Sequence, residues 1–267
     1  MSDTFKGKAV ITGASAGIGK AYAERLAQRG YDLLLVARRA KLLEDVASSL
    51  RSAHGVKVST IIADLGDPKA LDGVATTIAS DDSITMLVNN AGTSSMSAVG
   101  NATTAGTDAM TDLNITALVR LTLAVLPGFK ARNKGTIINL GSILGFHSLP
   151  VSAIYSGTKG YVLNFTRGLQ DELADTGVSV QLVLPAATAT DLWDISGVPL
   201  SALDPATVMT VDDMVDAALT GLDLGEAITL PSVENAKELL DAYDAARMTL
   251  LAAGQTSKPA SRYRLAA

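Results

Sequence analysis

The stretch Thr12-Gly13-Ala14-Ser15-Ala16-Gly17-Ile18-Gly19 decides the fold of this chain. It follows a short apolar run at residues 9–11 and leads into a helix-patterned segment at residues 18–29. Three glycines between a strand and a helix let backbone amides approach a pyrophosphate, and the start of a helix favours negative charge. This placement predicts a dinucleotide-binding turn, whereas a glycine cluster elsewhere is often only a tight turn.

Strand-like and helix-like segments alternate on both sides of this turn. Short aliphatic runs typical of buried strands cover residues 9–11, 33–36, 58–62, 86–88, 136–140, 178–184 and 227–230. Helical patterns cover residues 18–29, 41–52, 68–78, 108–131, 153–175, 211–222 and 232–252. Gly30 and Gly55 lie where helices should end, and Asp67-Pro68 is a helix start. The alternation predicts an α/β fold, a Rossmann-type doubly wound parallel sheet with helices on both faces.

The length and composition favour one domain over residues 1–267. The chain has 267 residues, of which 48% are hydrophobic and only 18% charged, so it has ample material for one large core. Residues 185–210 are rich in Thr, Ala and Pro and are predicted to form a mobile substrate loop. Residues 232–267 are expected to form a C-terminal helix and tail.

The net charge and the absence of cysteine exclude several classes of function. Lysine plus arginine number 22 against 27 acidic residues, and the net charge of −5 disfavours nucleic acid and anionic membranes as partners. The absence of cysteine excludes disulfides, thiolate zinc sites and a cysteine nucleophile. No export or anchoring pattern is visible at the N-terminus, so we expect a cytoplasmic protein without a metal site.

The second predicted strand is followed by Ala37, Arg38 and Arg39. An acidic residue here would bind the ribose hydroxyls of NAD, whereas arginine suits a ribose 2′-phosphate, with Ser15 as a further donor. The pair predicts NADP(H) as the cofactor, and an ordinary solvated helix start is the alternative. The missing carboxylate also argues against a Rossmann methyltransferase.

Tyr155 and Lys159 lie four residues apart in a predicted helix and so share one face. Tyrosine normally loses its proton at about pH 10, and a nearby ammonium together with an oxidised nicotinamide would stabilise the phenolate and bring its pKa toward working pH. Ser142, at the end of the preceding strand, can donate a hydrogen bond to a carbonyl oxygen. A Tyr/Lys pair alone is more often a surface contact, but together with Ser142 it predicts general acid–base chemistry on a carbonyl.

From about residue 8 to residue 190 the sequence resembles the short-chain dehydrogenase/reductase family. The glycine turn matches the pattern TGxxxGxG, and the family's Asn-Asn-Ala-Gly element stands here as Asn89-Asn90-Ala91-Gly92. The resemblance implies a catalytic tetrad of Asn114, Ser142, Tyr155 and Lys159. It also implies cofactor contacts at Gly13, Ser15, Gly17, Ile18, Gly19, Arg38, Arg39, Asp64, Leu65, Asn90, Ala91, Gly92, Tyr155, Lys159, Pro185, Thr188 and Thr190.

The resemblance further implies roles for individual residues. Asn114 would hold a helix kink and a water that links Lys159 to solvent, and Thr190 would contact the nicotinamide carboxamide. The family usually has glycine after the proline at Pro185, and Ala186 departs from this pattern. Family members commonly form dimers or tetramers, so we expect a homo-oligomer formed through the helices at residues 108–131 and 153–175.

The expected activity is reversible hydride transfer between NADP(H) and a small-molecule carbonyl compound or its alcohol, with Leu144, His147 and Trp193 lining a mixed pocket. A solvated loop histidine is the alternative for His147. A 3-oxoacyl carrier-protein reductase is the second candidate, although such proteins usually end in a strand with a Gly-Gly pair that this chain lacks. A non-catalytic NADP sensor is a third, although it would characteristically lose the tyrosine or lysine. A Ser-His-Asp hydrolase does not fit, because Ser142 stands one place early for a nucleophile elbow.

Overall fold

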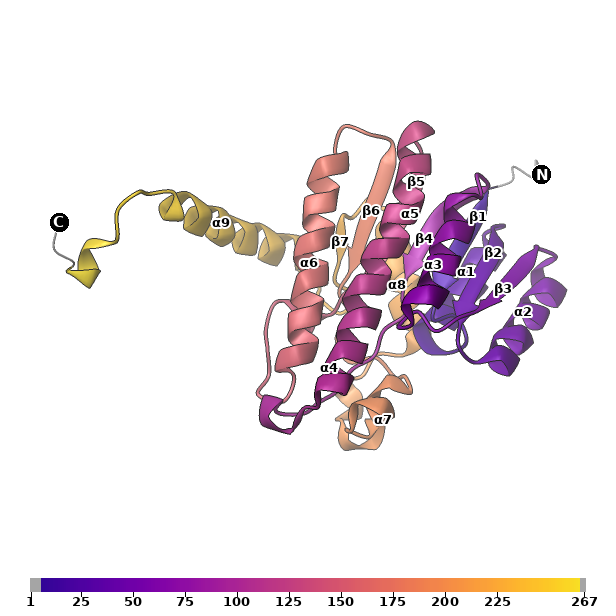
Figure 1. Ribbon diagram of the computed structural model, residues 1–267, viewed down its shortest axis with the longest axis horizontal. Helices are drawn as coiled ribbons and strands as arrows, with labels where there is room; N and C mark the ends of the chain where they lie inside the picture. The colour runs from indigo at the N-terminus through magenta and orange to yellow at the C-terminus, as the bar shows by residue number, and fades with distance from the viewer. Residues whose placement is uncertain (1–5, 265–267) are drawn as a thin grey trace. The chain divides into compact units, whose positions relative to one another are not determined.

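The computed structural model describes residues 6–264, which divide into two compact units, one ending at Ser232 and the other beginning at Val233. The first unit contains seven strands: β1 (Lys8–Thr12), β2 (Asp32–Ala37), β3 (Val58–Ile62), β4 (Ile84–Asn89), β5 (Gly135–Leu140), β6 (Val178–Val183) and β7 (Ile228–Thr229). They form one parallel sheet in the order β3-β2-β1-β4-β5-β6-β7 (Figure 1). The order reverses between β1 and β4, which confirms the predicted doubly wound sheet and places ligands at that point.

Helices cover both faces of this sheet. The helices of the first unit are α1 (Gly17–Gln28), α2 (Ala40–His54), α3 (Pro68–Ala79), α4 (Thr104–Thr111), α5 (Leu118–Ala131), α6 (Ala153–Leu173), α7 (Leu192–Ser196) and α8 (Val211–Asp223). Apolar side chains of α1, α2 and α8 share one core with the sheet, and those of α3, α5 and α6 share the other. Figure 1 shows α3, α5 and α6 on the same face.

Local start and stop signals act as the sequence predicts. The Asp67 side chain accepts a hydrogen bond of 2.7 Å from the amide of Ala70 and so caps α3. Gly55 ends α2 with φ of 67°, a left-handed conformation that suits glycine.

The helix predicted at residues 108–131 differs in detail. It begins at Thr104, capped by Thr103, and passes through a π-helical turn at Asp112–Ala117 before it continues as α5. A π turn holds one more residue than an α turn and often marks a functional site. Periodicity over the whole segment predicts the helix but not this widened turn.

The helical stretch Thr104–Ala131 is also the one stretch, among the described residues, that is long and apolar enough to cross a membrane by composition. Its Leu121, Val125 and Phe129 are buried in the core shared with the sheet. A helix that covers a sheet in a globular core meets the same criterion, and the buried face shows that this one has that position.

The segment at residues 185–210, predicted as a loop, contains α7 and is joined to itself by a β-bridge between Thr188 and Met209. The second unit contains α9 (Ala236–Gly254), which begins later than the predicted residue 232 because turns occupy residues 231–235. A single domain over all 267 residues stays a prediction.

Candidate active site

A cavity of about 700 Å³ opens at the carboxyl ends of β1, β4 and β5. Most of the predicted site residues line it, namely Gly13, Ser15, Gly17, Ile18, Arg38, Arg39, Asp64, Leu65, Asn90, Ala91, Gly92, Ser142, Leu144, Tyr155, Lys159, Pro185, Thr188, Thr190 and Trp193. Gly19, Asn114 and His147 are not among the described lining residues. The cavity therefore brings the glycine turn and the Ser/Tyr/Lys group to one place.

The glycine turn is shaped by close approach to the segment after β4. Gly13 has φ of 69°, and a Cβ there would lie 2.8 Å from Nδ2 of Asn90. A Cβ on Gly19 would lie 2.5 Å from the same nitrogen and 2.5 Å from the carbonyl oxygen of Gly13. Gly19 therefore serves the packing of the turn, while Gly13 also reaches the cavity.

The start of α1 is suited to an anion. No side chain caps it, and its first turn contains no acidic residue, so neither a capping oxygen nor a carboxylate competes for its amides. Free amides and the positive end of the helix favour a phosphate at this position.

Thr12 is a structural residue of the site to which the sequence analysis assigned no role. Its hydroxyl oxygen accepts hydrogen bonds from the amides of Asn90 (3.0 Å) and Ala91 (2.9 Å). Nδ2 of Asn90 donates back to the carbonyl oxygen of Thr12 at 2.8 Å. These contacts fasten the Asn-Asn-Ala-Gly element to the end of β1. The threonine of the TGxxxGxG pattern was the available signal.

The two arginines lie at one end of the cavity. Nε and Nη2 of Arg39 donate to the Ser15 hydroxyl at 3.3 and 3.2 Å, and Nη1 of Arg38 lies 3.5 Å from Oδ2 of Asp64. Both arginine side chains are exposed, and each guanidinium has more donors than these contacts use. This end of the cavity suits a dinucleotide that carries an additional phosphate.

Tyr155 and Lys159 come from the first two turns of α6, and each is only 8% exposed. Nζ of Lys159 donates to the carbonyl oxygen of Leu140 at 2.9 Å and lies 5.7 Å from the centroid of the Tyr155 ring. Ser142 hydrogen-bonds to the Tyr155 phenol, and its Oγ accepts from the amide of Leu144 at 3.1 Å. The Tyr155 phenol and the Ser142 hydroxyl therefore lie together in the cavity lining.

Burial shifts the pKa values of both Tyr155 and Lys159. Burial raises the pKa of Tyr155 to about 12, and the hydrogen bond from Ser142 only partly opposes this. Burial also lowers the pKa of Lys159 to about 8, because the ammonium loses its hydration. The expected lowering of the Tyr155 pKa by Lys159 together with an oxidised nicotinamide stays a prediction. The phenol keeps its proton at neutral pH and is ready to donate it.

Asn114 lies in the π-helical turn and is 2% exposed. Its Oδ1 accepts from the amide of Thr93 at 2.8 Å, and its Nδ2 donates to the carbonyl oxygen of Thr93 at 2.9 Å and to Oγ1 of Thr158 at 3.0 Å. Asn114 thus connects the widened turn to α6 without reaching the cavity. Its predicted water stays a prediction.

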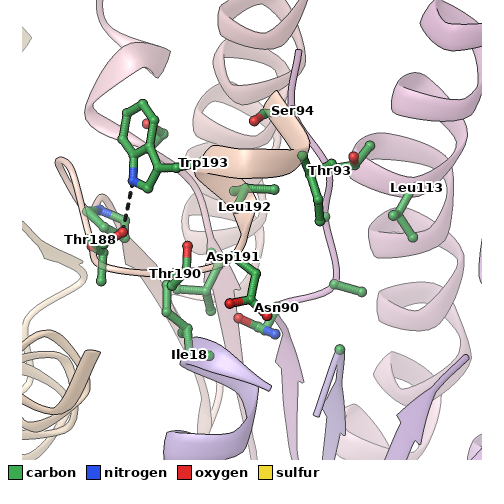
Figure 2. A pocket seen from close by; sticks show the side chains of 18 of the residues that line it. Ile18, Asn90, Thr93, Ser94, Leu113, Thr188, Thr190, Asp191, Leu192 and Trp193 are labelled. Atoms are coloured by element: carbon green, nitrogen blue, oxygen red, sulfur yellow. Dashed lines mark hydrogen bonds between the residues drawn. The ribbon is translucent and has the colours of Figure 1, made fainter. Parts of the chain in front are cut away.

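The end of the cavity away from Arg38 and Arg39 is apolar. Figure 2 shows Trp193 beside Leu192, with the indole Nε1 donating to the carbonyl oxygen of Thr188 at 2.9 Å. The apolar lining consists of Met96, Leu113, Leu144, Leu149, Val151, Leu192, Trp193, Ile195, Val198 and Leu203. Several of these, such as Met96 and Leu203, lie in irregular segments that have no periodic signal in the sequence.

The structure also gives the positions of His147 and Ala186. His147 is exposed and is not among the described lining residues, which agrees with the alternative of a solvated loop histidine, and its contact with substrate stays a prediction. Ala186 does not belong to the described non-glycine residues with positive φ, which are Asn133 and Arg264. The loop after Pro185 therefore does not require the glycine that the family usually has there.

Comparisons with known proteins show the family of this chain. The short chain dehydrogenase family profile matches residues 7–196. A solved short-chain dehydrogenase from Sphingobium yanoikuyae in complex with NADPH is 42% identical, with a TM-score of 0.92 over 96% of this chain and 100% of that chain. The bulky-bulky ketone specific alcohol dehydrogenase from Comamonas testosteroni is 40% identical, with a TM-score of 0.89 over 97% of this chain and 99% of that chain.

Curated relatives are similar over a shorter part of their length. Very-long-chain 3-oxoacyl-CoA reductase-A of Danio rerio is 40% identical over 199 residues, which are 70% of this chain and 60% of that protein. The chain thus spans about 60% of the length of such a relative. Because the family profile covers most of the chain and the catalytic group lies in its cavity, this protein belongs to the short-chain dehydrogenase family of oxidoreductases.

Proposed function

We propose that this protein is an NADP(H)-dependent oxidoreductase that interconverts a ketone or aldehyde and its alcohol. The observation that carries the proposal is the buried phenol of Tyr155 beside Ser142 and Lys159, between a phosphate-binding turn and an apolar pocket. The NADPH complex of the Sphingobium yanoikuyae protein and the ketone specificity of the Comamonas testosteroni protein support it.

The residues present fit NADP(H). The glycine turn and the start of α1 would hold the pyrophosphate, and Arg38 and Arg39 would hold the 2′-phosphate. Lys159 would bind the nicotinamide ribose, and Thr190 the carboxamide side. When bound, the nicotinamide supplies the hydride.

The protein's own part is to hold the carbonyl and move a proton. In the reducing direction, the Ser142 hydroxyl donates a hydrogen bond to the substrate oxygen, where negative charge develops. Tyr155 then gives its phenolic proton to that oxygen. The raised pKa of about 12 keeps Tyr155 protonated until an alkoxide, which is more basic, takes the proton. The ammonium of Lys159, whose Nζ lies 5.7 Å from the centroid of the Tyr155 ring, would stabilise the phenolate that remains.

A reductase of 3-oxoacyl thioesters is the second candidate, whether the acyl group is carried by a carrier protein or by coenzyme A. The name of the Danio rerio relative favours it, and the same three side chains would serve a 3-oxo group. The non-catalytic sensor is disfavoured, because Tyr155 and Lys159 are both in place in the cavity.

The test follows NADPH consumption with aldehydes, ketones, diketones and β-ketoesters, repeated with NADH and with Tyr155→Phe. We expect turnover that prefers NADPH and falls by at least about a hundredfold in the variant, because the proton donor is lost. NADPH binding by the variant, measured by fluorescence, is the control for its fold. Full activity of Tyr155→Phe would overturn the assignment.

We also propose that the protein is a cytoplasmic homo-oligomer, a dimer or tetramer assembled through α5 and α6. Leu123 on α5 is 59% exposed and Tyr161 on α6 is 45% exposed, and such apolar side chains are commonly covered in assemblies. Light scattering after size exclusion tests the oligomer, and cell fractionation tests the location. A monomer, or recovery in the membrane fraction, would contradict the respective part.

A further inference from the structure

We infer that the substrate end of the cavity selects carbonyl compounds by charge, accepting neutral and cationic ketones and rejecting anionic ones, including thioesters that bear phosphates. The inference rests on the proposed function and names the substrate class of the same site. It comes from how charged residues are distributed around the cavity.

The two ends of the cavity differ in charge. Arg38 and Arg39 lie at the cofactor end. The substrate end is built by residues 91–117, 141–158 and 185–210, which contain no lysine or arginine. The same three segments contain five aspartates: Asp108, Asp112, Asp191, Asp194 and Asp204.

Two of these aspartates belong to the cavity or its rim. Asp191 lines the cavity and is the residue before α7, and Figure 2 labels it among the lining side chains. Asp194 is exposed and stands between Trp193 and Ile195, both of which line the cavity. Among the described residues, neither aspartate forms an ion pair. Their charge is therefore not cancelled locally.

The positive groups nearby cannot receive a second anion. Lys159 is buried, and its Nζ donates to the carbonyl oxygen of Leu140. His147 is exposed and lies outside the described cavity lining. A substrate phosphate at the mouth would meet no cationic side chain from the three segments, although phosphates in proteins are usually bound by arginine, lysine or helix ends.

The mouth itself is apolar. Leu149, Val151 and Ile195 line the cavity and are 43%, 43% and 65% exposed. An uncharged substituent that extends from the reacting carbonyl can lie against these side chains. A pantetheine arm would pass the same rim and bring its phosphates near Asp194, where like charges repel.

The test uses three aryl ketones that differ in one para substituent: a methyl ester, a carboxylate and a trimethylammonium group. We expect kcat/KM for the carboxylate to be lower than for the ester by about tenfold at low salt, because two nearby charges repel it. The difference in kcat/KM between the ester and the carboxylate should become smaller at high ionic strength, where exposed charges are screened. The trimethylammonium ketone should equal or exceed the ester.

Asp194→Lys supplies the matched variant, since it reverses a rim charge and leaves the reacting groups untouched. It should raise kcat/KM for the carboxylate by about tenfold and leave the methyl ester within about twofold. Asp175→Lys makes the same change of charge in the turn between α6 and β6. This turn lies at the amino end of β6, away from the cavity, so the variant should affect neither substrate. Equal effects of the two variants would overturn the inference.

Acetoacetyl-CoA separates this inference from the proposed function. Reduction of the methyl ester but not of acetoacetyl-CoA, with loss of activity in Tyr155→Phe, supports both. Efficient reduction of acetoacetyl-CoA or of the carboxylate at low salt overturns charge selection while hydride transfer to a carbonyl stands. Failure to reduce any of these compounds, although NADPH binds, overturns the proposed function and the inference with it.

Discussion

The Nδ2 of Asn114 donates a hydrogen bond of 3.0 Å to Oγ1 of Thr158, and the same hydroxyl donates to the carbonyl oxygen of Tyr155 at 2.8 Å. Asn114 and Thr158 are only 2% and 4% exposed. One buried hydroxyl thus connects the π-helical turn to the backbone that carries the phenol. Thr158 is a positioning residue, because it touches the reacting side chain only through the backbone.

Thr158→Val should lower kcat by about tenfold with little change in KM, because loss of about 1 kcal/mol of buried hydrogen bonding loosens the position of Tyr155. Thr158→Ser keeps the hydroxyl and should retain most of the activity. Steady-state kinetics and thermal unfolding of the three proteins provide the measurement. Loss of activity in the serine variant but not in the valine variant would show that the methyl group, and not the hydroxyl, matters.

Lys159 makes stability depend on pH in a defined direction. Its pKa is about 8 in the folded protein against the usual 10.5, so between these values the unfolded chain binds more protons. The free energy of unfolding of the wild type should therefore rise from pH 8 toward pH 10, relative to Lys159→Met.

Below pH 8 the buried charge costs about 3 kcal/mol, so Lys159→Met should be as stable as the wild type or more so, although catalytically impaired. Urea unfolding at several pH values gives the comparison. The exposed Lys41→Met serves as control. Parallel curves for wild type and Lys159→Met would contradict the lowered pKa.

Gly19→Ala should weaken NADPH binding by at least about tenfold and destabilise the fold by about 1–3 kcal/mol. The added Cβ would lie 2.5 Å from the Gly13 carbonyl oxygen and from Nδ2 of Asn90, so the turn must shift. Gly73→Ala is the control, because no heavy atom lies within 4 Å of its Cβ. In the interior of α3 it should stabilise by about 0.5–1 kcal/mol. Titration calorimetry measures NADPH affinity, and scanning calorimetry measures the stability of the two variants. Unchanged NADPH affinity in Gly19→Ala would count against the turn as the cofactor site.

Arg39→Ala should raise KM for NADPH by about tenfold and leave KM for NADH nearly unchanged, since only NADPH carries the 2′-phosphate. Arg39→Lys retains the charge but not the bidentate geometry, and an intermediate value is expected. The same comparison with Arg38→Ala shows how the two guanidinium groups share the phosphate. A similar rise in KM for NADH and NADPH would show that the arginines do not bind the 2′-phosphate.

The sequence alone determined the parts of this protein that depend on short-range patterns. Strand and helix alternation predicted the parallel sheet, because burial on both faces leaves continuous apolar runs. The glycine turn, Arg38 and Arg39 follow their strands directly, so their place at the carboxyl edge was readable from order along the chain. Tyr155 and Lys159 were paired by helical spacing.

Only the tertiary structure decided which groups from distant segments meet. The π-helical turn at Asn114, its link to Thr158 and the role of Thr12 depend on contacts between elements far apart in sequence. The sequence left two positions open for His147, in the pocket or in a solvated loop, because a loop's course has no periodic signal. The pKa of Tyr155 is raised because desolvation depends on everything packed around the phenol, and that packing exists only once the chain has folded.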